Sequence, residues 1–180
     1  ARQLAAPAPH LRMAVLEKEA ELATHQTGHN RGVMHSGIYY RPGSHKAQFC
    51  VAGLNNLVRF CEENEIEYEQ CGKVIVATDE SQVSLLDELY RRGVANGVEG
   101  LQIIDRPRLR ELEPHAAGVK AIHSPNTGVV NFTEVSEAFA GEMAKSGGDL
   151  LTDARVQSVS RRDGMLQLET SAGDLSTRFA

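Results

Sequence analysis

The sequence lacks the features of nucleic-acid-binding and membrane-spanning proteins. Its 180 residues include 24 acidic and 19 basic side chains, for a net charge of −5, and no tryptophan. The basic residues occur singly or in pairs, not in the clusters that bind a phosphate backbone. The longest strand-like apolar run, Val74–Ala77, is far shorter than the ~20 residues needed to cross a bilayer. We therefore expect no nucleic-acid partner and no membrane span.

Cysteine is scarce, and its spacing fits neither a redox motif nor a zinc site. The three cysteines lie 11 and 10 positions apart, at Cys50, Cys61 and Cys71. Cys50 and Cys61 fall on one apolar helix face and are expected to be buried packing residues. Three histidines, at His25, His29 and His35, lie in a glycine-broken loop without nearby carboxylates, so we predict no metal site.

Both ends of the chain lack the signals that begin or end an element. Residues 1–6 are typical of the last turns of a helix without a preceding cap, and residues 175–180 of an alternating strand without a stop. We therefore expect the chain to be a window cut from a longer polypeptide. The first residues also lack the pattern of a secretory signal peptide, and together with the cysteine usage this favours the cytoplasm.

Apolar periodicity predicts alternating strands and helices over most of the chain. We expect strands at 11–16, 72–78, 101–104 and 119–123, and helices at 47–61, 81–96, 107–112 and 133–145. The tail is expected to form a meander, with strands at 149–152, 155–160, 165–170 and from 175, and turns at 162–164 and 172–174. This order predicts an α/β fold with a small α/β or α+β layer.

Glu17 follows the first predicted strand, which is where dinucleotide-binding folds place an acidic residue. A carboxylate there accepts hydrogen bonds from the adenosine ribose, ~20 residues after a glycine fingerprint that approaches the pyrophosphate. Counting back from Glu17 places those glycines before Ala1, so the fingerprint is absent from this chain. Glu17 alone is also compatible with an ordinary polar strand end.

The loop after Glu17 carries a longer and more specific pattern. Residues 24–44 read THQTGHNRGVMHSGIYYRPGS. This stretch resembles the L-2-hydroxyglutarate dehydrogenases and oxidases, FAD-dependent members of the D-amino-acid oxidase/glycerol-3-phosphate dehydrogenase superfamily. The resemblance continues through residues 46–50, 71–78 and 122–132, and so covers essentially the whole chain. Arg31 departs from it, since the family usually has a serine there.

The resemblance implies a fold and a reaction. It implies a Rossmann-like FAD-binding domain in two segments, 1–70 and 126–180, interrupted by a smaller substrate-binding domain at 71–125. The implied reaction is oxidation of L-2-hydroxyglutarate to 2-oxoglutarate, with electrons passed through flavin to a quinone or oxygen. It allows peripheral association with the inner face of the cell membrane. The alternatives are a flavin enzyme for another 2-hydroxy acid, glycerol 3-phosphate or an amino acid, and an inactive piece that cannot hold FAD alone.

The resemblance also implies roles for individual residues. The cofactor contacts would be Glu17, Lys18, Thr27, Gly28, Asn30, Gly32, Val33, His35, Ser36, Gly37 and Val156. Tyr39, Tyr40 and Lys73 are candidates for the substrate side, because a dicarboxylate pairs with cationic and phenolic donors. His35 is the candidate catalytic base, and a structural imidazole is its alternative. The pattern at Lys73 is more typical of an exposed charge at a strand edge, and that at His123 of packing at a strand end or a bond within a turn.

Overall fold

The chain forms two compact units in the computed structural model, which describes residues 10–179. Unit 1 combines the described residues up to Asn30 with those from Phe132 onward, and unit 2 is Arg31–Asn131. The helix expected at residues 1–6 lies outside the described residues. The unit boundaries differ from the expected functional boundaries near residues 70 and 125, and the division into FAD and substrate domains stays a prediction.

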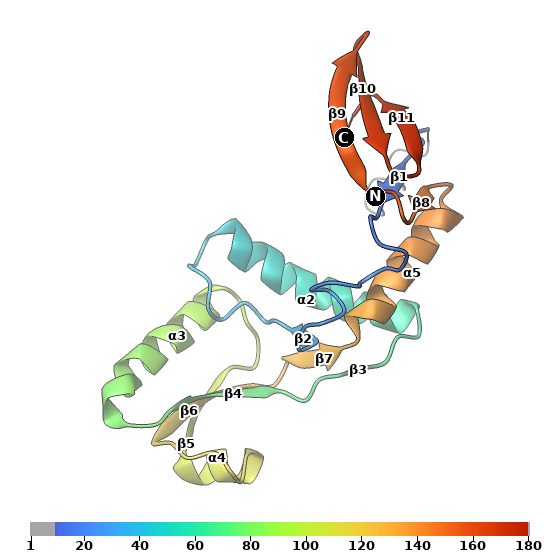
Figure 1. Cartoon of the computed structure of the whole chain (residues 1–180). Coiled ribbons are helices and arrows are strands. Elements are labelled where there is room, and N and C mark those ends of the chain that lie inside the picture. The colour runs from blue at the N-terminus through green and yellow to red at the C-terminus, as the bar shows by residue number, and fades with distance from the viewer. Residues whose placement is uncertain (1–9, 180) are drawn as a thin grey trace. The chain divides into compact units, whose positions relative to one another are not determined.

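Unit 1 pairs two distant strands in parallel. Strand β1 (Ala14–Leu16) lies beside β8 (Asp149–Leu151), which follows helix α5 (Phe132–Lys145) (Figure 1). The strand expected from residue 11 begins at Ala14, because β8 offers partners to three residues only. Helix α5 begins at Phe132, one residue before the start expected at 133.

The rest of unit 1 is the predicted meander. Strands β9 (Val156–Arg162), β10 (Met165–Thr170) and β11 (Gly173–Thr177) are antiparallel, in the order β11-β10-β9. The turn between β9 and β10 has positive φ at Asp163 and Gly164, as in the type I′ turns that join twisted strands. The second turn was misplaced, because pairing continues to Thr170 and Gly173 and the turn is residues 171–172.

Unit 2 contains an antiparallel sheet between two sets of helices. Strands β4 (Lys73–Ala77), β6 (Lys120–Ser124) and β5 (Gln102–Asp105) run in the order β4-β6-β5 (Figure 1). A short 3-10 helix (Glu80–Gln82), α3 (Val83–Ala95) and α4 (Arg106–Leu112) connect these strands. Of the two expected layers, the α+β one is therefore correct, because every strand pair here is antiparallel.

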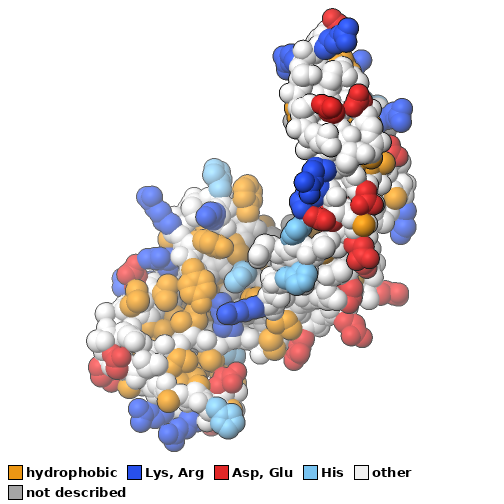
Figure 2. All heavy atoms as spheres, in the orientation of Figure 1, with side chains coloured by type: hydrophobic (Ala, Val, Ile, Leu, Met, Phe, Trp, Pro, Cys, Tyr) orange, Lys and Arg blue, Asp and Glu red, His pale blue; other side chains and the backbone are white. Residues whose placement is uncertain are grey.

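The two faces of this sheet carry separate clusters of buried side chains. Ile122 packs with Leu86 of α3 and with Ile38, whereas Ala121 packs with Leu109 of α4. Successive strand residues point to opposite faces, so neighbours on β6 serve different clusters. The surface of the molecule also shows apolar side chains among charged ones (Figure 2).

A second small sheet and a long helix complete unit 2. Strands β2 (Val33–Met34), β7 (Gly128–Val130) and β3 (Tyr68–Glu69) run in the order β2-β7-β3. The sequence did not predict these strands, because two or three residues are too few for a period-two pattern. Helix α2 (His45–Glu63) begins after Ser44, whose side chain accepts a hydrogen bond from the Ala47 N–H.

Candidate functional site

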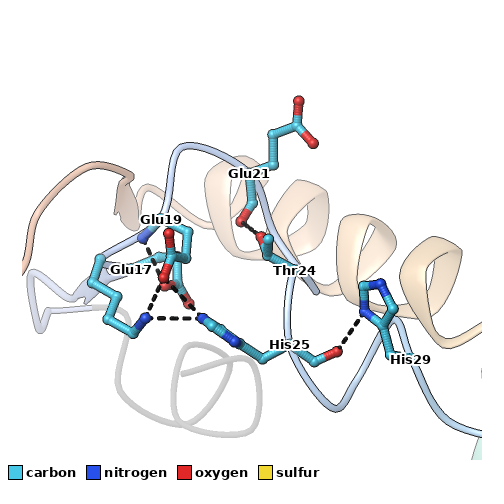
Figure 3. Close-up of polar contacts among 7 residues, drawn as sticks. Glu17, Glu19, Glu21, Thr24, His25 and His29 are labelled. Carbon is cyan, nitrogen blue, oxygen red and sulfur yellow. Dashed lines mark hydrogen bonds and ion pairs between the residues drawn. The ribbon is translucent and has the colours of Figure 1, made fainter.

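Glu17 lies directly after β1 in unit 1, as the sequence predicted. Its backbone N–H donates to the Leu151 carbonyl at 2.9 Å, and its own carbonyl accepts from the Ala154 N–H at 2.8 Å. Its half-buried carboxylate accepts one hydrogen bond from the Glu19 N–H, 2.9 Å from Oε1 (Figure 3). An ionised carboxylate has about four acceptor positions, so Glu17 can also accept hydroxyl donors.

Lys18 is exposed and takes part in an ion-pair network beside Glu17. The Lys18 ammonium pairs with the Glu19 carboxylate, and His25 Nε2 lies 2.8 Å from Glu19 Oε1 and 2.9 Å from Lys18 Nζ (Figure 3). The hydrogen bond from Lys18, followed by that from His25, lowers the pKa of Glu19 to about 2. The network links the end of β1 to the loop that carries Thr27, Gly28 and Asn30.

This loop is held by hydrogen bonds within itself. Asn30 Nδ2 donates to the Thr27 carbonyl at 2.7 Å and to the Gln26 carbonyl at 3.0 Å. A Cβ on Gly28 would lie 2.1 Å from the Ala23 carbonyl oxygen, so the tight turn requires glycine. Thr27, Gly28 and Asn30 are all exposed.

Val156, the remaining predicted cofactor contact in unit 1, begins β9 at an irregular pairing. Thr170 pairs with Val156 but Glu169 pairs with Ser158, so Gln157 is an extra residue in the strand. Such a bulge redirects the backbone locally. Val156 is 41% exposed.

In unit 2 the predicted cofactor residues begin with a close contact between two backbones. Gly32 has a φ of +66°, and a Cβ there would lie 2.6 Å from the Val130 carbonyl oxygen. The Val130 N–H donates to the Gly32 carbonyl at 2.9 Å, and Val33 pairs with Val129 in the next position. The backbone at Gly32 therefore lies against β7 at a separation that excludes any side chain.

Ser36 and Gly37 are buried, and long-range contacts hold both. The Ser36 hydroxyl lies 3.3 Å from Thr127 Oγ1 and 3.4 Å from Ser124 Oγ, and these two are 3.1 Å apart. Gly37 has a φ of +98°, and its carbonyl accepts a hydrogen bond from Asn96 Nδ2 at 2.9 Å. The sequence did not predict these partners of Ser36 and Gly37.

The candidate substrate residues divide into two groups. Lys73 Nζ lies 4.8 Å from the centre of the Tyr39 ring, as in a cation–π contact. Lys73 is half-buried and not an exposed edge charge, so that alternative was wrong. Tyr40 contributes its carbonyl to Asn96 Nδ2, also at 2.9 Å. The structure thus brings together Tyr39 and Lys73, whereas the contact of Tyr40 with Asn96 is through the backbone.

Burial sets the charge state around Lys73. Desolvation lowers the pKa of Lys73 and raises the pKa values of Tyr39 and Cys50. The phenol and the thiol therefore stay protonated to higher pH than exposed groups do. Lys73 contributes the positive charge of this group, and Tyr39 a neutral hydroxyl.

Cys50 forms a hydrogen bond to the backbone of His35 that the sequence did not predict. Cys50 Sγ donates to the His35 carbonyl at 3.3 Å, and Cys50 is half-buried, whereas Cys61 is fully buried. The expectation of a fully buried Cys50 was wrong, because this helix position faces the loop. The His35 side chain is exposed, and His123 lies within β6 against Gly72.

The described residues contain neither a metal cluster nor a membrane-spanning helix. No three His, Cys, Asp or Glu side chains in residues 10–179 form a group that could hold a metal ion. Over the same range, every helix is too short or too polar to cross a bilayer. The site groups are instead a half-buried carboxylate in unit 1 and, in unit 2, an ammonium–phenol pair near a buried glycine segment. A carboxylate that can accept ribose hydroxyls fits the nucleotide half of FAD.

Comparison with known proteins identifies related sequences. Residues 1–178 match the family model for FAD-dependent oxidoreductases, DAO. The chain is 48% identical, over 156 residues, to mitochondrial L-2-hydroxyglutarate dehydrogenase of Nematostella vectensis. It is 46% identical, over 171 residues, to L-2-hydroxyglutarate dehydrogenase of Indibacter alkaliphilus. These alignments cover 87% and 95% of this chain but 34% and 43% of the relatives, so the chain spans less than half their length.

A solved structure shares the fold. Dithionite-reduced L-α-glycerophosphate oxidase from Mycoplasma pneumoniae, solved with FAD bound, aligns with a TM-score of 0.80. The alignment covers 88% of this chain and 43% of that chain, at 22% sequence identity. The mixed α/β arrangement described above is therefore that of FAD-dependent oxidoreductases of this type.

Proposed function

Since this chain belongs to the DAO family of FAD-dependent oxidoreductases, we propose that the protein carrying it oxidises L-2-hydroxyglutarate to 2-oxoglutarate. The observation that carries this proposal is the 46–48% identity to two L-2-hydroxyglutarate dehydrogenases across most of the chain. FAD, when bound, supplies the two-electron acceptor for the hydrogen on the alcohol carbon. The chain's own residues bind and orient the cofactor and the substrate.

In unit 1, Glu17 is the proposed ligand of the adenosine ribose. Its position at the end of β1 and its remaining acceptor capacity support this role. Lys18, Thr27, Gly28, Asn30 and Val156 are the other proposed cofactor contacts of this unit. The glycine at position 28 allows the tight turn, in which the N–H groups of Gly28 and His29 both donate to the His25 carbonyl.

In unit 2, Lys73 and Tyr39 are the proposed partners of a substrate carboxylate. A half-buried ammonium donates stronger hydrogen bonds than an exposed one, because water screens it less. The Tyr39 hydroxyl, whose pKa is raised by burial, is a second donor. Tyr40 remains a proposed substrate-side residue without a described side-chain contact.

Gly32, Val33, Ser36 and Gly37 are the proposed flavin-side residues of unit 2, and His35 is the proposed base. An exposed imidazole can take the proton from the substrate hydroxyl as the carbon is oxidised. As the acceptor of the electrons that FAD would pass on, we propose a quinone or oxygen. We propose a cytoplasmic location, with peripheral membrane association if the acceptor is a membrane quinone.

Anaerobic reduction of the bound flavin tests the proposed function. The purified full-length protein is mixed with L-2-hydroxyglutarate, its D-enantiomer, glycerol 3-phosphate or an amino acid, and the flavin absorbance is followed. We expect L-2-hydroxyglutarate to bleach the flavin and to yield an equal amount of 2-oxoglutarate. Bleaching by an amino acid or glycerol 3-phosphate alone would assign the protein to another reaction.

A further inference from the structure

Asn96, at the C-terminal end of helix α3, forms side-chain hydrogen bonds to the backbone of the segment that carries His35 and Tyr39. We propose that Asn96 is a positioning residue for substrate binding, and this rests on the proposed function. Asn96 follows the last residue of α3, and its Nδ2 donates to the carbonyls of Gly37 and Tyr40, both at 2.9 Å. One amide group thus bridges the two ends of a four-residue turn.

The side chain of Asn96 is not needed to end the helix. Its backbone N–H already bonds the Arg92 carbonyl at 3.0 Å and the Gly93 carbonyl at 3.2 Å. Asn96 Oδ1 is buried and has no hydrogen-bond partner among the described residues. A buried acceptor without a partner is destabilising, so the two bonds to residues 37 and 40 are what this amide contributes.

Neighbouring contacts make the bridge rigid. The side chain of Ile38, between the two bridged carbonyls, is fully buried with Leu86 and Leu101. A Cβ on Gly93 would lie 2.5 Å from Leu101 Cδ1 and 3.6 Å from Ile38, so the segment packs closely on this helix. The turn is therefore held by its backbone on Asn96 and by the Ile38 side chain in the core.

Two proposed substrate-side residues belong to this segment, one before the turn and one within it. Before the turn, the His35 carbonyl accepts a hydrogen bond from Cys50 Sγ at 3.3 Å. Within it, Tyr39 places its ring under the Lys73 ammonium. Loss of the Asn96 bonds would leave the core contact of Ile38 and the hydrogen bond from Arg92 Nη1 to the Tyr39 carbonyl at 3.4 Å, but would release the carbonyls of Gly37 and Tyr40. Both Tyr39 and His35 would then sample more positions.

The test compares two asparagines that each follow the last residue of a helix. Asn96→Ala removes both bridging bonds, and Asn96→Asp keeps the size but turns acceptor oxygens toward two carbonyls. Asn64→Ala is the matched control, because Asn64 ends α2 and its Nδ2 donates to the Phe60 carbonyl of the same helix at 3.0 Å. In the full-length protein we measure KM for L-2-hydroxyglutarate, the Kd of FAD, the Tm and the rate of Cys50 alkylation.

We expect Asn96→Ala to raise KM about five- to tenfold and to change the Kd of FAD less than about twofold. Asn96→Asp should raise KM at least as much. Cys50 should react faster with iodoacetamide in both Asn96 variants than in the wild-type protein. The rate is measured from the alkylated peptide that contains Cys50, and alkylation of the exposed Cys71 serves as the reference. Asn64→Ala should lower the Tm comparably and leave both KM and Cys50 labelling unchanged.

The outcomes separate this inference from the proposed function. An unchanged KM in Asn96→Ala, or equal changes in Asn96→Ala and Asn64→Ala, would overturn the positioning role. If the wild-type protein does not oxidise L-2-hydroxyglutarate, that result overturns the proposed function but does not decide the role of Asn96. KM is then measured for the substrate that reduces the flavin, and the same comparison of variants decides the role of Asn96.

Discussion

The proposed site residues of the two units differ in what holds them. In unit 1, Thr27 and Asn30 are exposed, and the Asn30 side chain bonds carbonyls three and four positions away. In unit 2, Ser36 and Gly37 are buried and bond residues 91 and 59 positions away. The unit 2 segment is thus held by residues distant in the sequence, whereas the bonds described for the unit 1 loop are to residues within about seven positions.

This difference predicts different responses to ligand and to mutation. A segment held in place before a ligand arrives loses little conformational freedom on binding, so its contacts contribute more of their energy to affinity. An exposed loop held by local bonds tolerates substitutions better, because few other residues depend on it. Substitutions in unit 2 should therefore have the larger effects on stability.

The largest effect is expected at Gly32. Gly32→Ala places a Cβ 2.6 Å from the Val130 carbonyl oxygen at a φ of +66°, so β2 and β7 must separate. We expect a loss of about 3 kcal/mol in the free energy of unfolding. Gly43→Ala is the control, since Gly43 has a φ of +77° but no atom within 4 Å. Its cost should be about 1 kcal/mol, measured by urea unfolding, and equal costs would contradict the close contact.

An intermediate effect is expected in the pH dependence of substrate binding. Burial lowers the pKa of Lys73 from its ordinary value of 10.5, so the ammonium is lost at lower pH than in an exposed lysine. KM for a dicarboxylate should therefore rise as the pH increases through this lowered pKa. In Lys73→Arg the charge persists, and KM should stay flat over the same range. Parallel KM profiles of the two proteins would show that Lys73 does not bind the substrate.

The smallest effect is expected at Glu19. Its pKa is lowered from 4.5 to about 2, so its contribution to stability is present above pH 4.5 and is lost as the pH falls through about 2. Because the ion pairs are exposed, Glu19→Gln should lower the Tm by no more than about 2 °C at pH 7. Glu21→Gln is the control, as the Glu21 carboxylate points away from this network (Figure 3). A larger loss would mean that the network supports the loop as a whole.

Much of the fold, and the place of Glu17 at the end of a strand, could be predicted from the sequence. Helix α2 and strands β4 and β6 have strong apolar periodicity, and Glu17 stands directly after its strand. The glycines at 28 and 32 could be identified from the family resemblance. Their physical reason, a carbonyl oxygen within 3 Å of the missing Cβ, required the structure.

The residues that sequence analysis missed act across long separations. Asn96 reads as an ordinary helix terminator, and no local pattern connects it to residues 37 and 40. Cys50 lies on an apolar helix face, so its bond to the His35 carbonyl is invisible in the periodicity. Strands β2, β3 and β7 are too short to be seen without their partners.

The central claim is that the proposed site residues of unit 1 bind the cofactor and that the residues around Lys73 in unit 2 bind the substrate. Its most direct test measures the Kd of FAD and KM for L-2-hydroxyglutarate in Glu17→Gln and Lys73→Gln of the full-length protein. We predict that Glu17→Gln weakens FAD binding about tenfold or more and leaves KM at saturating FAD unchanged, whereas Lys73→Gln raises KM by a similar factor and leaves FAD binding unchanged. Equal effects of both substitutions on both constants, or no effect of either, would contradict it.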